Sequence, residues 1–229
     1  MGLPLYLAMT GAEMRCASQL PTHFAYMACH FSPYGEGISN IPDALPDQAI
    51  LILNDRMPCH GHSPSLIVQQ LSDAVSRLGC ESILLDFIQP PDSESEAMVH
   101  AIVEANACPV AVSTQYADGL RCPVFLPPCP LHVPLEEYLL PRKGREIWLE
   151  AALDSTCFRV TSQGCTTQQD SIQDLPFCDE ELHCHYKIEL TDDSALFSIS
   201  RTREDLDSLL AEATSYRVTR AVGLWQEIY

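Results

Sequence analysis

Short apolar runs recur along the whole chain and constrain its fold more than any other feature. Most are continuous rather than alternating, which is typical of strands covered on both faces of a parallel sheet. We therefore expect eight strands of a mainly parallel sheet, at residues 3–9, 24–31, 50–54, 83–87, 110–114, 124–126, 146–153 and 221–225.

Three segments between these runs carry the signals of amphipathic helices. The first follows Ser63 as its cap and stops at Gly79, the second begins with the capping-box spacing at Ser93, and the third begins at Thr202. Caps, an apolar stripe and a terminal glycine together predict helices rather than loops. Strands alternating with helices indicate an α/β fold.

Other connections are short, and one is long. Only residues 117–122 join two of the expected strands, although a parallel crossover normally takes a dozen residues or more. Residues 154–200 read as an excursion of antiparallel strands at 158–161, 186–190 and 196–199. We expect a small, partly stripped (β/α)8 TIM-like barrel, with this antiparallel β excursion before the last helix and strand.

Charge and composition exclude several kinds of partner. The sequence has 31 acidic and 13 basic residues, a formal charge of −18 spread along the chain. Such a surface repels nucleic acids and anionic membranes, so we expect neither as a partner. No run reaches the roughly 18 apolar residues of a spanning helix, and no export signal is evident. We therefore expect one cytoplasmic domain over residues 1–229; a protein partner stays open.

The eleven cysteines are scattered and form no CxxC pair, which fits reduced thiols better than a disulfide framework. Two segments, 59–62 and 178–185, concentrate Cys and His. Neither has the two spaced ligand pairs of common zinc sites, and strand alternation places Cys184 opposite its neighbouring histidines. We expect no metal and no cofactor.

Polar residues end many of the expected strands. In a parallel barrel the loops that reach a ligand leave from these C-terminal ends, so the pattern predicts a polar pocket there. The alternative is that strand ends simply meet solvent. The residues are His30, Asn54, Asp55, Asp86, Gln89, Gln115, Tyr116, Glu150, Trp225, Gln226 and Glu227.

Asp86 is the strongest single candidate among them. It lies inside the apolar run ESILLDFIQPP, so it should be partly buried and should need a partner. Asp55 ends the preceding strand, and neighbouring strands lie about 4.8 Å apart. The two acids could form the carboxylate pair that glycoside hydrolysis uses.

Trp225 is a candidate for holding a sugar ring, because the C–H face of a sugar stacks on an aromatic surface. Tyr116 and Tyr34 could extend such a platform, and a core position for Trp225 is the alternative. No nucleophile elbow, phosphate-binding glycine loop or HExxH motif occurs.

The chain resembles the barrel of the family 18 glycoside hydrolases, the chitinase-like enzymes. The resemblance rests on the order of ESILLDFIQPP and GREIWLEAAL and on a C-terminal stretch that reads YKIELTDDSALFSISRTREDLDSLLAEATSYRVTRAVGLWQE. It implies a final barrel strand whose tryptophan, here Trp225, floors a sugar pocket.

The fourth strand departs from the family motif DGxDxDxE. Aligned by the following proline, the motif falls on Glu81, Leu84, Asp86 and Ile88. The resemblance implies that Asp86 keeps an acid, whereas Ile88 occupies the position of the proton donor. Gln89 cannot replace that donor, because an amide does not titrate usefully. The family's Tyr-Asp pair after the sixth strand is also missing, since the chain reads VFLPPCP there.

Three functions remain open at this point. The first is a degenerate barrel that binds a carbohydrate or related small molecule without the family chemistry. The second is an active glycosidase with relocated carboxylates, and the third is a protein-interaction scaffold that uses the excursion. The candidate catalytic residues are Asp86, Asp55 and Glu150. The candidate ligand-binding residues are Trp225, Gln115, Tyr116, Gln89 and Glu227.

Overall fold

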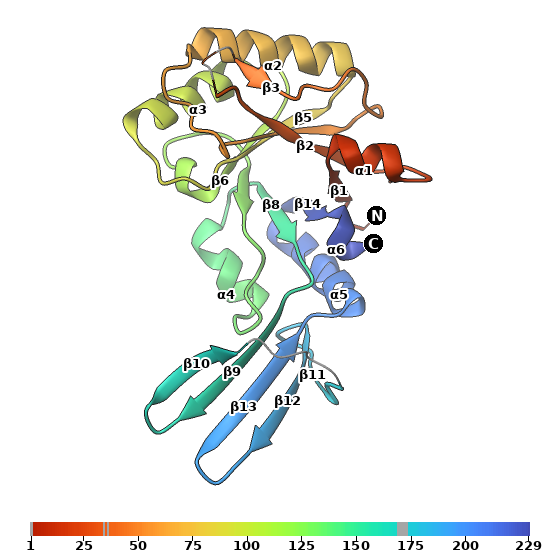
Figure 1. The fold of residues 1–229 in the computed structure, drawn as a ribbon, viewed down its shortest axis with the longest axis vertical. Coiled ribbons are helices and arrows are strands. Elements are labelled where there is room, and N and C mark those ends of the chain that lie inside the picture. The colour runs from red at the N-terminus through yellow and green to blue at the C-terminus, as the bar shows by residue number, and fades with distance from the viewer. Residues whose placement is uncertain (1, 34, 36, 169–173) are drawn as a thin grey trace.

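A computed structural model describes residues 2–33, 35, 37–168 and 174–229. Eight parallel strands form a closed barrel, because β1 pairs with both β2 and β14. The α/β barrel expected from the apolar runs is confirmed (Figure 1). Its strands are β1 (Leu5–Met9), β2 (Phe24–Phe31), β4 (Ile50–Asn54), β5 (Ser82–Asp86), β6 (Val110–Ser113), β7 (Val124–Leu126), β8 (Ile147–Ala151) and β14 (Val218–Leu224).

The last strand differs from its expected bounds. β14 begins at Val218 rather than at residue 221 and ends at Leu224, so Trp225 starts the short helix α6 (Trp225–Ile228). The early start has a structural reason, because Val218 and Arg220 already pair with β8. Trp225 is therefore not a strand residue.

The three expected helices are present as α2 (Pro64–Leu78), α3 (Ser93–Ala105) and α5 (Arg203–Ala213). α2 ends at Gly79, whose φ of 66° suits a residue without a Cβ. α3 differs from expectation, because its cap is Asp92 and not Ser93; the Asp92 side chain accepts bonds from two amides of the first turn. The Thr202 cap of α5 is confirmed.

The remaining connections are reduced, as the short spacers predicted. A short strand, β3 (Ile38–Ser39), pairs antiparallel with β2. The other elements are one or two turns long, namely α1 (Gly11–Cys16), α4 (Leu135–Leu139) and the 3-10 turns at Thr114–Tyr116, Leu140–Arg142 and Thr214–Tyr216. Loops after several strands are thus short, which leaves the barrel partly stripped of its outer helices.

The excursion forms a second, five-stranded antiparallel sheet in the order β10-β9-β13-β12-β11. It projects from the barrel (Figure 1). Three strands match the expected ones: β9 (Ser155–Thr161), β12 (Cys184–Leu190) and β13 (Ser194–Ser200). β10 (Gly164–Gln168) and β11 (Phe177–Asp179) were not foreseen, because GCTTQ and FCD carry no clear apolar alternation. Part of the predicted excursion, residues 169–173, lies outside the described residues.

Two kinds of core hold the barrel. One fills its interior with alternate strand residues, among them Ile52, Leu84 and the fully buried Trp148. The other packs the outer strand faces against the helices, on one side around α2 and α3 and on the other around α5. Because side chains alternate along a strand, this division fixes which residues point to the barrel axis.

Candidate functional site

Three polar side chains face the barrel axis at the C-terminal end of the strands. Asn54, Asp86 and Glu150 each lie two residues beyond a member of the interior core on the same strand. Strand alternation therefore directs them inward. The mouth of the barrel, as we call these three residues, lies where barrel proteins place their ligands.

The two acids of the mouth both have raised pKa values. Burial raises the pKa of Asp86, and the charge of Asp55 adds to this rise. Burial also raises the pKa of Glu150, to about 7, with further contributions from Asp86 first and then Asp154 and Glu227. Within the described part of the chain, no basic side chain pairs with Asp86 or Glu150. Glu150 is thus a carboxyl group poised to be half-protonated near neutral pH.

Asp55 has a different environment from Asp86. It is only 4% exposed, and its two oxygens accept the backbone N–H groups of Ile88 at 2.9 Å and Gln89 at 2.7 Å. These bonds anchor the loop after β5. The predicted Asp55–Asp86 pair stays a prediction; the structure places Glu150 as a further acid coupled to Asp86.

Gln115 and Tyr116 support the same loop from the end of β6. The Gln115 amide donates to the carbonyls of Phe87 at 2.8 Å and Gln89 at 2.9 Å, and the Tyr116 hydroxyl donates to Gln89 at 3.1 Å. Tyr116 is buried and packs edge-on against Phe87. Its described contacts support the loop, whereas its predicted contact with a ligand stays a prediction. Tyr34 lies outside the described residues.

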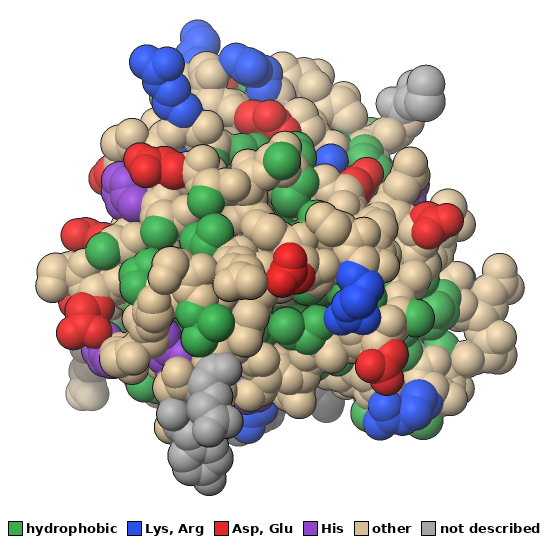
Figure 2. Space-filling model, turned by 90° about the horizontal axis from the view of Figure 1, so that it is seen from above, with side chains coloured by type: hydrophobic (Ala, Val, Ile, Leu, Met, Phe, Trp, Pro, Cys, Tyr) green, Lys and Arg blue, Asp and Glu red, His purple; other side chains and the backbone are tan. Residues whose placement is uncertain are grey.

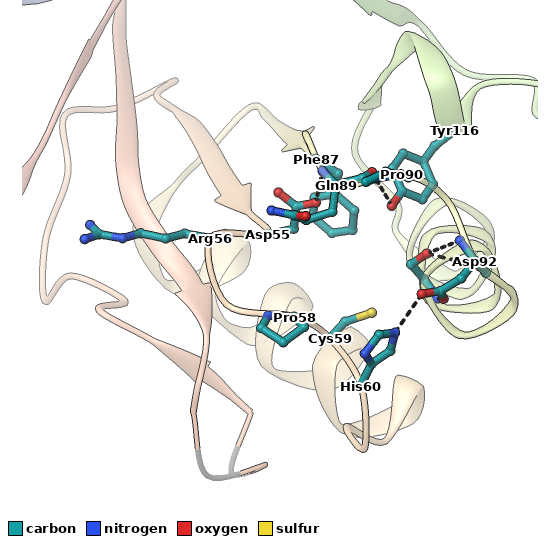
Figure 3. A pocket seen from close by; sticks show the side chains of 11 residues that line it. Asp55, Arg56, Pro58, Cys59, His60, Phe87, Gln89, Pro90, Asp92 and Tyr116 are labelled. Atoms are coloured by element: carbon teal, nitrogen blue, oxygen red, sulfur yellow. Dashed lines mark hydrogen bonds and ion pairs between the residues drawn. The ribbon is translucent and has the colours of Figure 1, made fainter.

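A pocket of about 400 Å³ lies beside the mouth, between the loops after β4 and β5 (Figure 3). We call it the rim pocket. His60 and Asp92 meet across it at 2.7 Å, and the ion pair raises the pKa of the histidine. The rim pocket thus brings together three predicted site residues, Asp55, Gln89 and Tyr116, with residues that the sequence did not identify as part of a site. Its lining is Asp55, Arg56, Pro58, Cys59, His60, Phe87, Gln89, Pro90, Asp92, Ser95 and Tyr116.

Trp225 lies apart from the mouth. It packs against the two outer cores and not the interior one, because inward positions of β14 fall on alternate residues that end at Leu224. Its ring stacks on Tyr229, and both line a groove of about 940 Å³ with Arg203 and residues 17–23. Glu227 is exposed on α6, close enough to contribute to the raised pKa of Glu150.

Ile88 follows the inward-facing Asp86 by two residues and is 72% exposed. Its backbone N–H is held by Asp55. The position that the family motif reserves for a proton donor therefore carries an exposed alkyl side chain, which can contact a ligand but cannot exchange a proton.

The fold gives the members of the two sequence clusters of Cys and His different partners. In the first, His60 turns to Asp92 while His62 contacts the backbone of Cys59. In the second, Cys184 is buried and His183 pairs with Glu212. Sequence spacing gave no indication that Asp205, from the distant helix α5, joins Cys178 and His185.

Sequence reasoning also missed how the site is assembled. It named Asp86 and Glu150 separately, but their coupling depends on closure of the barrel, since β5 and β8 are not neighbours in the sheet. His60 and Asp92 were not proposed as site residues. The cap position of Asp92 before α3 was the available signal, because caps of helices that follow barrel strands lie on the ligand side.

The fold and this site define a class of protein: a (β/α)8 barrel with carboxyl groups facing its axis at the C-terminal end. No protein-family model matches the chain, and a search of curated proteins finds none of similar sequence.

On the face shown in Figure 2, Lys and Arg side chains stand in separate small groups. Among the described residues, no helix combines the length and apolarity needed to cross a membrane.

Solved structures with a similar fold include a family 18 glycoside hydrolase, chitinases and a spore cortex-lytic enzyme. A glycoside hydrolase family 18 N-acetylglucosaminidase from Paenibacillus barengoltzii aligns at a TM-score of 0.62 and 12% identity, over 97% of this chain and 94% of that one. The spore cortex-lytic enzyme SleL from Bacillus cereus aligns at 0.54 and 8%, over 96% and 70%. The C-terminal domain of a putative chitinase from Desulfitobacterium hafniense aligns at 0.55 and 9%, over 98% and 94%.

These likenesses show the fold alone. The chain has the barrel fold of the chitinase-like glycoside hydrolases, as its resemblance to them implied, and is only 8 to 12% identical to these structures in sequence. Activity and ligand have to be argued from the residues at the mouth.

Proposed function

We propose that the protein binds a carbohydrate or related small molecule at the mouth of the barrel, without the acid–base chemistry of family 18. The observation that carries this proposal is the arrangement around Asp86: two inward carboxyl groups without a cationic partner among the described residues, beside an exposed Ile88. Titratable groups with strongly perturbed pKa values tend to mark functional sites.

The chemistry of the mouth suits a sugar. Carboxylates accept hydrogen bonds from hydroxyl groups, and charge-assisted bonds are stronger than neutral ones. Ile88 offers an apolar contact for the C–H face of a ring. The solved structures of similar fold include enzymes named as a chitinase and an N-acetylglucosaminidase, which makes amino sugars the first ligands to test.

A glycan panel with amino-sugar oligomers tests the proposal. A ligand that binds the folded state raises the melting temperature, and we expect Asp86→Asn and Glu150→Gln to remove that rise. Glu104→Gln is the matched control, because Glu104 is an exposed acid on the outer helix α3. No rise with any glycan, or an unchanged rise in both mouth variants, would count against the proposal.

Trp225→Ala separates two places for the sugar. If the mouth binds it, the rise persists in this variant, because Trp225 lines the separate groove beside Tyr229. If Trp225 floors the sugar pocket, as the family resemblance implied, Trp225→Ala abolishes the rise while Asp86→Asn retains it. The second result would move the binding site to that groove.

A second candidate function is glycoside hydrolysis with relocated carboxylates. The pKa of about 7 for Glu150, beside a second inward acid, favours it, because a general acid is most useful near the working pH. Here Glu150 would protonate the glycosidic oxygen, and Asp86 would act as nucleophile or base. Asp55 and Glu227 stand as further candidate carboxylates.

Chromogenic glycosides test the second candidate. We expect turnover to fall as pH rises through about 7, because Glu150 then loses its proton, and to collapse in Glu150→Gln. Glu104→Gln should leave turnover unchanged. Absence of turnover with a broad panel would eliminate hydrolysis and leave binding.

A further inference from the structure

Three side chains that commonly bind metal ions meet where the second sheet adjoins α5. They are Cys178 from β11, His185 from β12 and Asp205 from α5. One ligand atom from each lies within 4.8 Å of the other two. They play no part in the mouth or the rim pocket.

Pairing and capping bring the three together. Cys178 is directly opposite His185 in the antiparallel pair of β11 and β12, so both side chains lie on one face at the short distance of cross-strand neighbours. Asp205 is the third residue of α5. Its Oδ2 accepts hydrogen bonds from the hydroxyl group and from the backbone N–H of the cap residue Thr202. The same oxygen lies 2.8 Å from Nδ1 of His185.

We propose that Cys178, His185 and Asp205 form a binding site for a divalent ion of the zinc class. Thiolate, imidazole and carboxylate are the three ligand types that Zn²⁺ takes from proteins. Three of them from three elements, with a fourth position open to solvent beside the exposed Cys178, match a four-coordinate site that keeps one water ligand.

The distances allow such a site with small movements. Zn–S bonds of about 2.3 Å and Zn–N or Zn–O bonds of about 2.0 Å place tetrahedral ligand atoms about 3.3 to 3.6 Å apart. Because the ligand atoms lie within 4.8 Å of one another, the site has to close by at most about 1.2 to 1.5 Å, which rotation of the exposed Cys178 side chain can supply. No described hydrogen bond occupies Oδ1 of Asp205, so this oxygen is available to an ion.

Local charge favours a cation. The carboxylates of Asp205, Glu180 and Asp179 lie near enough to the Cys178 thiol to place it in a negative field. That negative field opposes a free thiolate nucleophile but attracts a divalent ion, which in turn stabilises the thiolate. A thiolate and a carboxylate together neutralise the two charges of the ion.

The ion would connect the projecting sheet to the barrel. β11 is a three-residue edge strand, whereas α5 packs into the outer core. A ligand from each fixes the edge strand to the helix. Binding to the folded state alone therefore stabilises the protein.

Zinc titration of the full chain, after removal of metals with a chelator, tests the proposal. We expect one Zn²⁺ per chain and a higher melting temperature. Cys178→Ser and His185→Asn should each weaken binding by more than about tenfold. Co²⁺ should give the absorption of a thiolate-to-metal charge transfer, and Cys178→Ser should lose it.

Cys165→Ser is the matched control. Cys165 is an exposed thiol on β10 of the same sheet, far along the strand order from β11, so its removal should change neither stoichiometry nor affinity. Far-UV circular dichroism checks that each variant folds. Binding that survives in both Cys178→Ser and His185→Asn, or no binding of Zn²⁺ and Co²⁺ to the folded wild-type chain, would overturn the site.

Discussion

The two ends of the barrel interior differ in whether their charged side chains have partners among the described residues. At the N-terminal end, Arg220 lies 3.1 Å from Glu81 and donates to Ser82 at 2.8 Å. Its guanidinium also lies over the rings of Trp148, at 4.5 Å, and Tyr6, at 5.8 Å. Each charge at this end has a partner of opposite sign or an aromatic face.

At the C-terminal end, Asp86 and Glu150 face the same interior without a cation among the described residues. Both carboxyl groups have raised pKa values, chiefly because burial disfavours their charged form. A charge with a partner tolerates burial, whereas a buried charge without one lowers stability and is better explained by a ligand. The N-terminal end is thus structural, and the C-terminal end is where we place function.

The largest loss of stability should come from removing a charge at the N-terminal end, where the charged side chains have partners. Arg220→Met leaves Glu81 without its cation in a partly buried setting, and we expect the free energy of unfolding to fall by about 3 kcal/mol. Urea denaturation measures it. Arg121→Met, which removes an exposed arginine, should change stability by less than about 0.5 kcal/mol.

A double variant sharpens this test. Glu81→Gln combined with Arg220→Met removes both charges, so it should be less destabilised than the sum of the single variants. Additive losses would mean that Arg220 acts through packing on Trp148 rather than through the ion pair.

The next effect separates two acids at the C-terminal end. Asp55→Asn should destabilise by about 2 kcal/mol, because an amide cannot accept both N–H bonds from the loop after β5. Asp86→Asn is the matched change at an acid that accepts no such bonds from the described part of the chain, and it should not destabilise at pH 8. Equal losses in urea denaturation would show that both acids are structural.

Glu150 should make stability depend on pH. Its pKa is about 7 when folded against a usual 4.5, so between these values the folded chain binds more protons than the unfolded one. The resulting contribution of Glu150 to the free energy of unfolding is fully present below about pH 4.5 and is lost as the pH rises to about 7. Glu150→Gln should flatten this decline and raise stability at pH 8 by about 1 kcal/mol, discounted for partial exposure. An unchanged pH profile by urea denaturation would contradict the shift.

The barrel could be predicted from the sequence because each strand has its own local apolar pattern. The apolar run around Leu84 predicts a strand and Thr202 predicts a helix cap, each from residues that are near neighbours in the sequence. Both predictions are confirmed. The candidate site depends on closure instead. Asp86 and Glu150 come from strands three places apart in the sheet and become coupled only across the interior. Trp225 shows the limit most clearly, because β14 ends one residue before it, on the inward-facing Leu224, and Trp225 begins α6 instead.

The smallest effect on stability should come from Ile88, and it bears most directly on the lost chemistry. Because Ile88 is 72% exposed, Ile88→Gln should change the free energy of unfolding by less than about 0.5 kcal/mol. Ile88→Glu has nearly the same size but adds a third carboxylate next to Asp86. We expect the stability difference between the Glu and Gln variants to be smaller at pH 5, where Glu150 is protonated, than at pH 8, where Glu150 is ionised and repels the new carboxylate. Urea denaturation at both pH values gives the comparison. Identical stabilities at pH 8 would place residue 88 outside the field of the mouth, and the exposed isoleucine would then no longer explain the absence of a proton donor there.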